Sequence, residues 1–182
     1  MIRSDGNEPD SHFYRPNVGA MLFNRQGLVF VGQRNDINDI EKDSGSWQMP
    51  HGGIDEGEDP RTAVLRELKE ETGTDKAEVI AETKGWFRYD IPSIVGDKLW
   101  KGKYKGQRQK WFALRFLGQD SDIDIAAHNP EFAAWKWAPL DDLPALIIPF
   151  KREVYVAVVA ELGPAVRSYL RANPVLSQLF LC

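Results

Sequence analysis

One stretch, residues 52–74, constrains the fold of this chain more than any other part of it. It predicts a loop that leads into a helix, because Asp59 can cap a helix N-terminus and Pro60 suits the first helical position. Good helix formers follow as far as Gly73, a residue type that commonly ends helices. The sequence therefore predicts one helix with a clear start and a clear stop.

Three glutamates on this helix share one face, because Glu67, Glu70 and Glu71 fall at positions i, i+3 and i+4. Arg66 lies one turn before Glu70 and can hold its carboxylate in place. A different face is expected to pack against a core, and it carries Val64, Leu65, Leu68 and Thr72. The three clustered carboxylates repel one another, so the acidic face lowers stability unless something offsets its charge.

A hard divalent cation would offset that charge. Magnesium takes oxygen ligands, keeps several waters, and is commonly shared between a few carboxylates and the phosphates of a substrate. The acidic face therefore predicts a site for Mg²⁺ or Mn²⁺ and for phosphate chemistry. The alternative is a solvated charged helix face, which is what most charge runs are.

Length and composition predict a single domain, because 182 residues with 42% hydrophobic content suffice for one well-buried core. We expect residues 1–12 to be a disordered tail and residues 13–182 to form the domain. A net charge of -4 excludes a globally basic nucleic-acid binder, so we expect no duplex DNA partner and only a local patch for RNA. The only cysteine is Cys182, and no run of about 18 apolar residues exists, which predicts a cytoplasmic protein without membrane contact.

The order of the expected elements indicates the fold class. Residues 18–24 and 28–34 predict a β-hairpin, and further strands are expected at 77–83, 86–91, 110–117 and 135–137. A helical pattern covers 150–162 and should end at Gly163-Pro164, with a further turn or two after it. Strands and helices without a regular βαβ alternation are typical of an α+β fold with a mixed sheet.

The spacing within residues 52–74 resembles the Nudix box, the signature of hydrolases acting on nucleoside diphosphates linked to another moiety. Gly52 is followed after five residues by Glu58 and after seven more by the run at 66–73. Such a match is expected by chance in this chain only about once in 10⁶ tries. Thr74 departs from the aliphatic residue usual there, which concerns helix packing rather than metal binding. The resemblance implies a Nudix fold, a mixed β-sheet sandwiched between α-helices, with motif positions of structural importance at Gly53, Glu58, Arg66 and Gly73.

Outside the box the chain is similar to one branch of the superfamily, the bacterial RNA pyrophosphohydrolases and the dinucleoside polyphosphate hydrolases. The similar runs lie at 14–19, 47–50, 106–112, 130–132 and 150–155. The resemblance extends over roughly residues 14–162. His51 stands where the family typically has glutamine, and this departure leaves its effect on substrate preference open.

The resemblance implies roles at the acidic face. Metal binding falls to Gly52, Glu67, Glu70 and Glu71, and catalysis to Glu67, Glu71 and Glu131. Glycine at position 52 lets the backbone approach a metal or a phosphate closely, because no side chain intervenes. The sequence leaves open whether Glu67 or Glu131 accepts the proton of the attacking water, since a base requires geometry before pKa.

Substrate binding is expected from five further residues. Arg15 and Lys110 resemble residues that contact 5′ phosphates, with surface salt bridges as the competing interpretation. Phe150 with Ile148 corresponds to a pair that stacks on the first base, and Tyr89 is a second stacking candidate. For these aromatic side chains, a place in the core is the alternative.

The acidic face predicts a metal-dependent hydrolase, and the resemblance implies that it removes pyrophosphate from the 5′ end of triphosphorylated RNA, a step that initiates mRNA decay. The alternative is hydrolysis of diadenosine tetraphosphate and other dinucleoside polyphosphates. A non-catalytic module that senses nucleotides is disfavoured, because all the carboxylates of the box are present. RNA ranks first because the basic residues at 98–110, interleaved with Trp100 and other aromatic residues, exceed what one dinucleotide requires. Protein partners leave no readable trace in the sequence.

Overall fold

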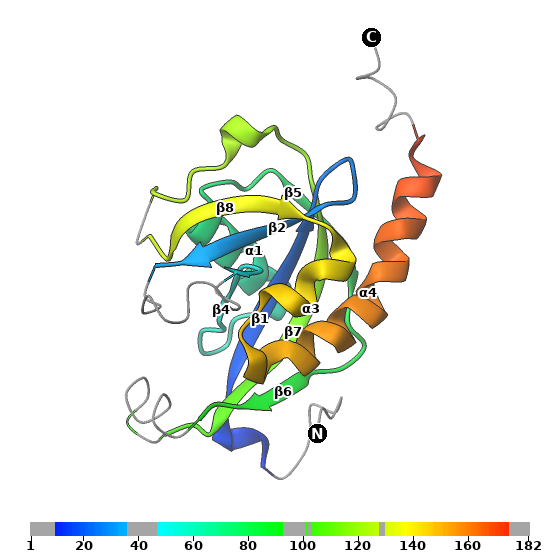
Figure 1. Ribbon diagram of the computed structural model, residues 1–182. Coiled ribbons are helices and arrows are strands. Elements are labelled where there is room, and N and C mark those ends of the chain that lie inside the picture. Colours follow the sequence, from blue (N-terminus) through cyan, green and yellow to red (C-terminus); the bar gives the residue numbers. More distant parts are fainter. Residues whose placement is uncertain (1–9, 36–46, 93–100, 102, 128–129, 175–182) are drawn as a thin grey trace.

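The computed structural model describes residues 10–35, 47–92, 101, 103–127 and 130–174 (Figure 1). The strands are β1 (Tyr14–Phe23), β2 (Val29–Arg34), β3 (Trp47–Gln48), β4 (His51–Gly53), β5 (Ala77–Glu82), β6 (Phe87–Asp90), β7 (Gly106–Phe116) and β8 (Phe132–Ala138). The α-helices are α1 (Pro60–Thr72), α3 (Leu143–Leu146) and α4 (Arg152–Ala172), and short 3-10 turns are η1 (Ser11–Phe13), η2 (Asp120–Asp122), η3 (Leu140–Asp142) and η4 (Pro149–Lys151). Of the tail predicted at residues 1–12, positions 1–9 are outside the residues that the structure describes. The expected boundaries of the domain stay a prediction.

All the strands described belong to one mixed sheet, with the order β3-β2-β1-β7-β5 along its main path. Its centre is a parallel ladder between β1 and β7, from Tyr14 opposite Gly106 to Phe23 opposite Arg115. The remaining strand pairs are antiparallel: β1 pairs with β2 and β4, β2 with β3 and β8, and β7 with β5 and β6. The mixed sheet expected from the sequence is confirmed. Both central strands begin about four residues earlier than the hydrophobic pattern predicted, because the parallel ladder extends past the apolar stretch.

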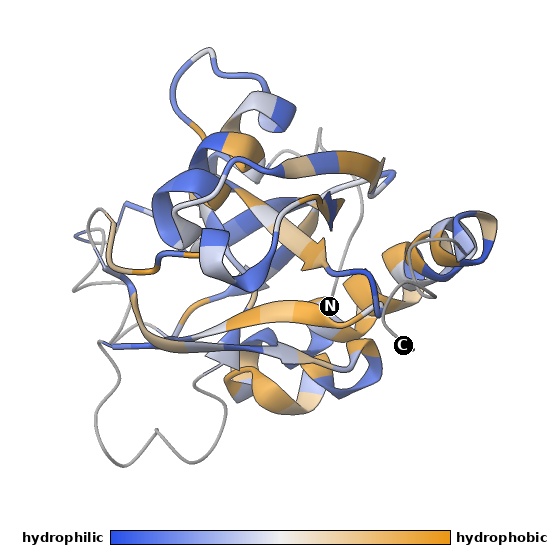
Figure 2. Cartoon of the chain, turned by 90° about the horizontal axis from the view of Figure 1, so that it is seen from above, coloured by the Kyte–Doolittle hydropathy of each residue, from blue (hydrophilic) through white to orange (hydrophobic). Residues whose placement is uncertain are grey.

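Helices cover both faces of the sheet. Figure 1 shows α1 behind the strands and α3 and α4 in front of them. Alternate residues of β1 serve the two faces: Val18 and Leu22 pack with Leu68 of α1, whereas Met21 and Phe23 pack with the helix α4. The strands at the centre are mostly hydrophobic in Figure 2, and the helices carry both kinds of residue. The α+β sandwich predicted by the resemblance is therefore confirmed.

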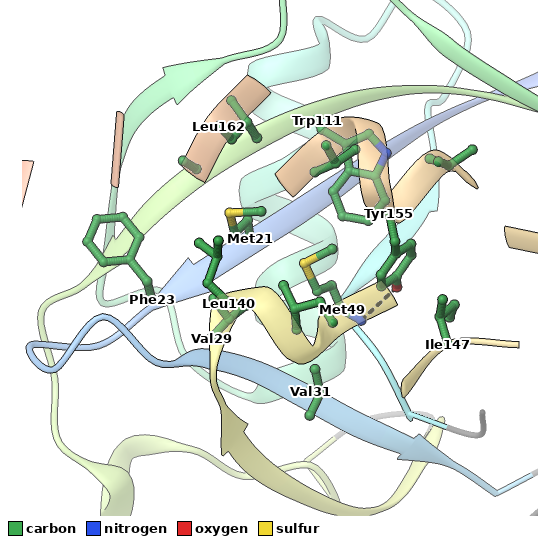
Figure 3. Packing of buried hydrophobic residues seen from close by; sticks show 14 of the residues in the cluster. Met21, Phe23, Val29, Val31, Met49, Trp111, Leu140, Ile147, Tyr155 and Leu162 are labelled. Atoms are coloured by element: carbon green, nitrogen blue, oxygen red, sulfur yellow. Dashed lines mark hydrogen bonds between the residues drawn. The ribbon is translucent and has the colours of Figure 1, made fainter. Parts of the chain in front are cut away.

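The core on the α4 side also fixes the chain just before β4. The backbone N–H of Met49 donates to the hydroxyl of Tyr155 at 2.9 Å, and Figure 3 shows this bond beside the fully buried Trp111. The ring of Tyr155 meets that of Trp111 edge-on at a centroid distance of 5.6 Å. Helix α4 thereby positions the segment that leads into the acidic helix.

The helix α1 matches its local signals. The carboxylate of Asp59 accepts hydrogen bonds from the backbone N–H groups of Arg61 and Thr62 at 3.0 and 3.2 Å. Gly73 ends the helix in the left-handed region at φ 74°, where a side chain would also crowd Asp124. Leu65 is 38% exposed, in contrast to the other residues predicted for the buried face, because it lies at the edge of that face.

The helix α4 contradicts the expected stop at Gly163-Pro164, because it runs unbroken to Ala172. Proline in a helix interior removes one backbone hydrogen bond and strains the preceding turn. Burial on both sides of that position offsets the cost, since Leu162, Gly163 and Val166 all lie in the core. Across the described part of the chain, no helix combines the length and apolar character needed to cross a membrane.

Candidate metal and substrate site

Strand β4 pairs with β1 and also contacts the acidic helix. Gly52 pairs with Val18 of β1, and a β-carbon at Gly52 would overlap the carboxylate of Glu67. At Gly53 a β-carbon would overlap the guanidinium of Arg15 from β1. The two glycines therefore let Glu67 and Arg15 approach the same short strand from its two faces.

Arg66 organises the acidic side. It donates two hydrogen bonds to the Glu58 carboxylate, from Nε at 2.9 Å and from Nη2 at 2.8 Å, and Nη2 also reaches the carbonyl of Gly53 at 2.9 Å. Its Nη1 lies 2.8 Å from Glu67 Oε1 and 3.4 Å from Glu70 Oε1, so the expected contact with Glu70 is present but is the longer one. The hydrogen bonds from Arg66 lower the pKa of Glu58 to about 2. The loop before α1 is thereby tied to the helix by an ionised pair.

Glu71 is the most constrained of the carboxylates. It is only 4% exposed, its Oε2 accepts the backbone N–H of His51 at 3.2 Å, and its Oε1 is buried without a hydrogen-bond partner among the described residues. Burial raises the pKa of Glu71 well above its ordinary value, and the neighbouring charges of Glu131 and Glu67 act in the same direction. The structure thus brings Glu131, which precedes β8, to the face formed by Glu67 and Glu71.

The acidic face is not a finished coordination shell as the side chains stand. Within the described parts of the chain, no three carboxylate, imidazole or thiolate groups converge closely enough to hold a metal ion. Arg66 instead binds one oxygen of Glu67 and one of Glu70. Burial also raises the pKa of Glu67. The unpartnered oxygen of Glu71 and these raised pKa values fit a place where a cation would relieve crowded carboxylates.

Two of the stacking candidates meet on the other side of β4. The rings of Tyr89 and Phe150 lie with centroids 6.0 Å apart and planes tilted by 40°. Tyr89 is 7% exposed, and its hydroxyl donates to Gln107 Oε1 at 2.7 Å, so its ring forms a fixed wall. Ile148 packs against the same hydrophobic cluster as both rings. The structure therefore joins three of the predicted substrate residues, although they come from distant parts of the sequence.

Lys110 is not brought to this group. Its position opposite Val18 places it on the α1 face of the sheet, whereas Tyr89 belongs to the cluster on the α4 face. Its ammonium donates to the carbonyl of Thr83 and lies 3.4 Å from Glu82 Oε1. These contacts fit the interpretation of a structural salt bridge better than a phosphate contact. Of the other basic and aromatic residues at 98–110, Lys98 and Trp100 lie outside the described residues. Two of the described lysines contact aromatic rings instead, since Lys103 lies over Tyr104 and Lys105 over Phe13.

Lys151 is a candidate that the sequence did not single out. It is 6% exposed, and its ammonium lies 3.0 Å from His51 Nε2 and 5.6 Å from the centroid of the Tyr89 ring. Burial, and then the charge of Lys151, hold the pKa of the His51 imidazole well below its ordinary range. In the sequence Lys151 belongs to a charged run at the start of a helix, and such runs are normally solvated. The only sequence signal for Lys151 was the similarity of residues 150–155 to the RNA pyrophosphohydrolase branch.

A ladder of buried amides forms a further group that the sequence did not predict. The indole N–H of Trp111 donates to Gln109 Oε1, and Gln109 Nε2 donates to Asn17 Oδ1 and to Gln107 Oε1, each at 3.1 Å. Because an indole can only donate, it fixes which way the Gln109 amide points. Gln107 Oε1 then accepts from both Gln109 and Tyr89, so the ladder holds the Tyr89 wall in place.

The chain matches one known family model and several known proteins. A family model described as NUDIX domain matches residues 13–158. The RNA pyrophosphohydrolase of Roseobacter denitrificans is 59% identical over 148 residues, which cover 80% of this chain and 89% of that protein. Proteins of the same name from Rhodospirillum rubrum and Rickettsia africae are 55% and 49% identical, covering 82% and 85% of this chain and 87% and 95% of theirs.

The fold is also found in a solved structure. The dihydroneopterin triphosphate pyrophosphohydrolase of E. coli superposes with a TM-score of 0.59 at 21% identity, covering 81% of this chain and 97% of that one. At such identity the likeness concerns the fold alone. The family match spans most of the chain, including the acidic helix, β4 and the first part of α4. The chain therefore belongs to the Nudix family.

Proposed function

We propose that this chain is a metal-dependent hydrolase that removes pyrophosphate from the 5′ end of triphosphorylated RNA. The observation that carries the proposal is the buried Glu71 carboxyl with its unpartnered oxygen, crowded by Glu67 and Glu131. Relatives at 49–59% identity that are named RNA pyrophosphohydrolase support it. A cytoplasmic place of action belongs to the same proposal, since the only cysteine is Cys182 and internal disulfides are excluded.

The acidic face would hold Mg²⁺ or Mn²⁺ through Glu67, Glu70, Glu71 and the backbone of Gly52. Such an ion, when bound, polarises a phosphoanhydride and activates water. The bidentate pair of Arg66 with Glu58 does not involve these ligands, so it would hold the loop before α1 in place if Glu67 and Glu70 turned to the ion. Glu67 and Glu131 both remain candidates for the base that accepts the proton of the water.

The opposite side of β4 would bind the nucleotide end of the substrate. Arg15 lies against Gly53, next to the metal face, and offers a planar donor group to phosphate oxygens. Tyr89 and Phe150 provide aromatic surface for the first base, with Ile148 beside them. Arg15 and the Tyr89–Phe150 pair therefore support binding of the phosphates and the first base on the face of β4 opposite Glu67.

The test compares two substrates. At equal salt and Mg²⁺, kcat/KM is measured on a short 5′-triphosphorylated RNA and on diadenosine tetraphosphate, with pyrophosphate and monophosphorylated RNA as the expected products of the first. A preference for the dinucleotide by about tenfold, or about 1.4 kcal/mol, would favour the dinucleoside polyphosphate alternative instead. Tight nucleotide binding with no product after long incubation with Mg²⁺ would favour a sensing module.

A further inference from the structure

His51 begins β4 and touches both halves of the candidate site. Its backbone N–H donates to Glu71 Oε2 at 3.2 Å, which ties it to the acidic helix. Its imidazole Nε2 lies 3.0 Å from the ammonium of Lys151, which itself lies 5.6 Å from the centroid of the Tyr89 ring. One residue thus connects the metal face with the aromatic wall of the nucleotide side.

The hydrogen-bonding capacities of these groups fix the form of the imidazole. An ammonium has donors only, so Nε2 of His51 must be the acceptor in the contact with Lys151. The proton of the neutral ring is then on Nδ1, which faces the side-chain amide of Gln48 at 3.5 Å. The oxygen of that amide must turn toward Nδ1 to accept, because the amide nitrogen is also a donor. A single arrangement therefore satisfies Lys151, His51 and Gln48 together.

The contact with His51 is one of the interactions that hold Lys151 in place. Its side chain is 6% exposed, so water does not replace a lost acceptor easily, and the flexible chain of a lysine is otherwise costly to hold in one conformation. A rigid ring that accepts through a single nitrogen fixes the ammonium more narrowly than a glutamine, whose amide can turn its donor side toward the lysine and repel it.

We propose that His51 is a positioning residue that holds the ammonium of Lys151 between the metal face and the Tyr89–Phe150 pair, where it meets the polyphosphate of the substrate. This inference rests on the proposed function, because it needs a substrate that spans both sides of β4. It also assigns a purpose to the residue at which this chain departs from the glutamine usual in its family.

The test uses His51→Phe, which keeps a ring but removes the acceptor, and His51→Gln, which restores one. His12→Phe is the matched control at a histidine outside the site. We expect His51→Phe to raise KM for a short triphosphorylated RNA about tenfold with kcat changed less than about twofold, and His51→Gln to recover most of the loss. An unchanged KM, or a fall in kcat alone, would refute a role in substrate binding.

A double-mutant cycle with Lys151→Met shows whether His51 acts through the lysine. If it does, adding His51→Phe to Lys151→Met has little further effect on KM, whereas independent roles would give effects that multiply. Additive behaviour of the two free-energy changes would therefore overturn the inference, even if each single variant is impaired.

A readout without substrate separates this inference from the proposed function. In ¹⁵N-labelled metal-free protein, two-bond ¹⁵N–¹H spectra should show His51, identified by its loss in His51→Phe, with a protonated Nδ1 and an unprotonated Nε2. A protonated Nε2 would exclude the acceptor role and refute the inference. A further outcome is that the spectra show the expected tautomer of His51 while the wild type cleaves no triphosphorylated RNA. In that case the contact of His51 with Lys151 is confirmed, but the proposed function and the role of His51 in substrate binding are both refuted.

Discussion

Replacing Glu71 by glutamine should change stability and activity in opposite directions. In the metal-free protein, burial and the neighbouring carboxylates Glu131 and Glu67 raise the pKa of Glu71 above its ordinary value of 4.5. An acid with a raised pKa binds its proton more tightly in the folded chain than in the unfolded one. The stability that this group confers is therefore present below about pH 4.5 and is lost as the pH rises toward the folded pKa. At higher pH an ionised Glu71 opposes folding.

Glutamine removes this cost while keeping the local hydrogen bond. Its oxygen can accept the N–H of His51, and its amide can donate to the neighbouring carboxyl of Glu131. We expect the free energy of unfolding of the metal-free protein to rise by about 1–3 kcal/mol, the usual range for a buried polar atom left unpartnered. In a chain of this size each kcal/mol corresponds to about 2–4 °C in Tm. Glu70→Gln is the control, because that side chain is 50% exposed and its replacement should stay within about 0.5 kcal/mol.

Magnesium should reverse the order of stability. At a free concentration of about 100 times its Kd, a bound ion stabilises the wild type by about 2.7 kcal/mol, and Glu71→Gln should lose most of this gain. The variant should also lose at least about 100-fold in kcat on triphosphorylated RNA, because a ligand of the ion is missing. Thermal unfolding with and without Mg²⁺ measures the change in stability, and steady-state kinetics on triphosphorylated RNA measure the change in kcat. A variant less stable than the wild type without metal, or equally active with it, would refute the reasoning.

Other parts of the molecule give three further predictions. Arg66 lowers the pKa of Glu58 to about 2, so the stability from this pair is present above about pH 4.5 and is lost as the pH falls toward 2. In urea unfolding, the free energy of unfolding of Glu58→Gln should therefore fall less steeply below about pH 4.5 than that of the wild type. Lys110→Ala should change KM for RNA less than about twofold and cost about 1 kcal/mol of stability; a tenfold rise in KM at unchanged Tm would restore its predicted phosphate contact. Pro164→Ala should raise Tm, since proline in a helix interior costs up to about 3 kcal/mol, and a lower Tm would contradict the continuous α4.

The sequence by itself determined the acidic helix, because its signals are short in range. The cap at Asp59, the stop at Gly73 and the spacing of Glu67, Glu70 and Glu71 all act within a turn or two of the chain. The order of the expected elements indicated the mixed sheet, and the resemblance added the family and the distant Glu131. Each of these follows from residues read in order, without knowledge of what they contact.

Only the tertiary structure decided which residues face one another. Three features depend on strands and helices far apart in the sequence. They are the parallel ladder of β1 with β7, the continuation of α4 beyond Pro164, which burial stabilises, and the side of the sheet on which Lys110 lies. The meeting of His51 and Lys151 is of the same kind. From the sequence alone, a lysine in a charged run is expected to be solvated. Lys151 is buried because η4, in which it lies, packs against Tyr89 of β6 and because its ammonium contacts His51 of β4. The free energy of that packing depends on distant parts of the chain, so no local pattern predicts it.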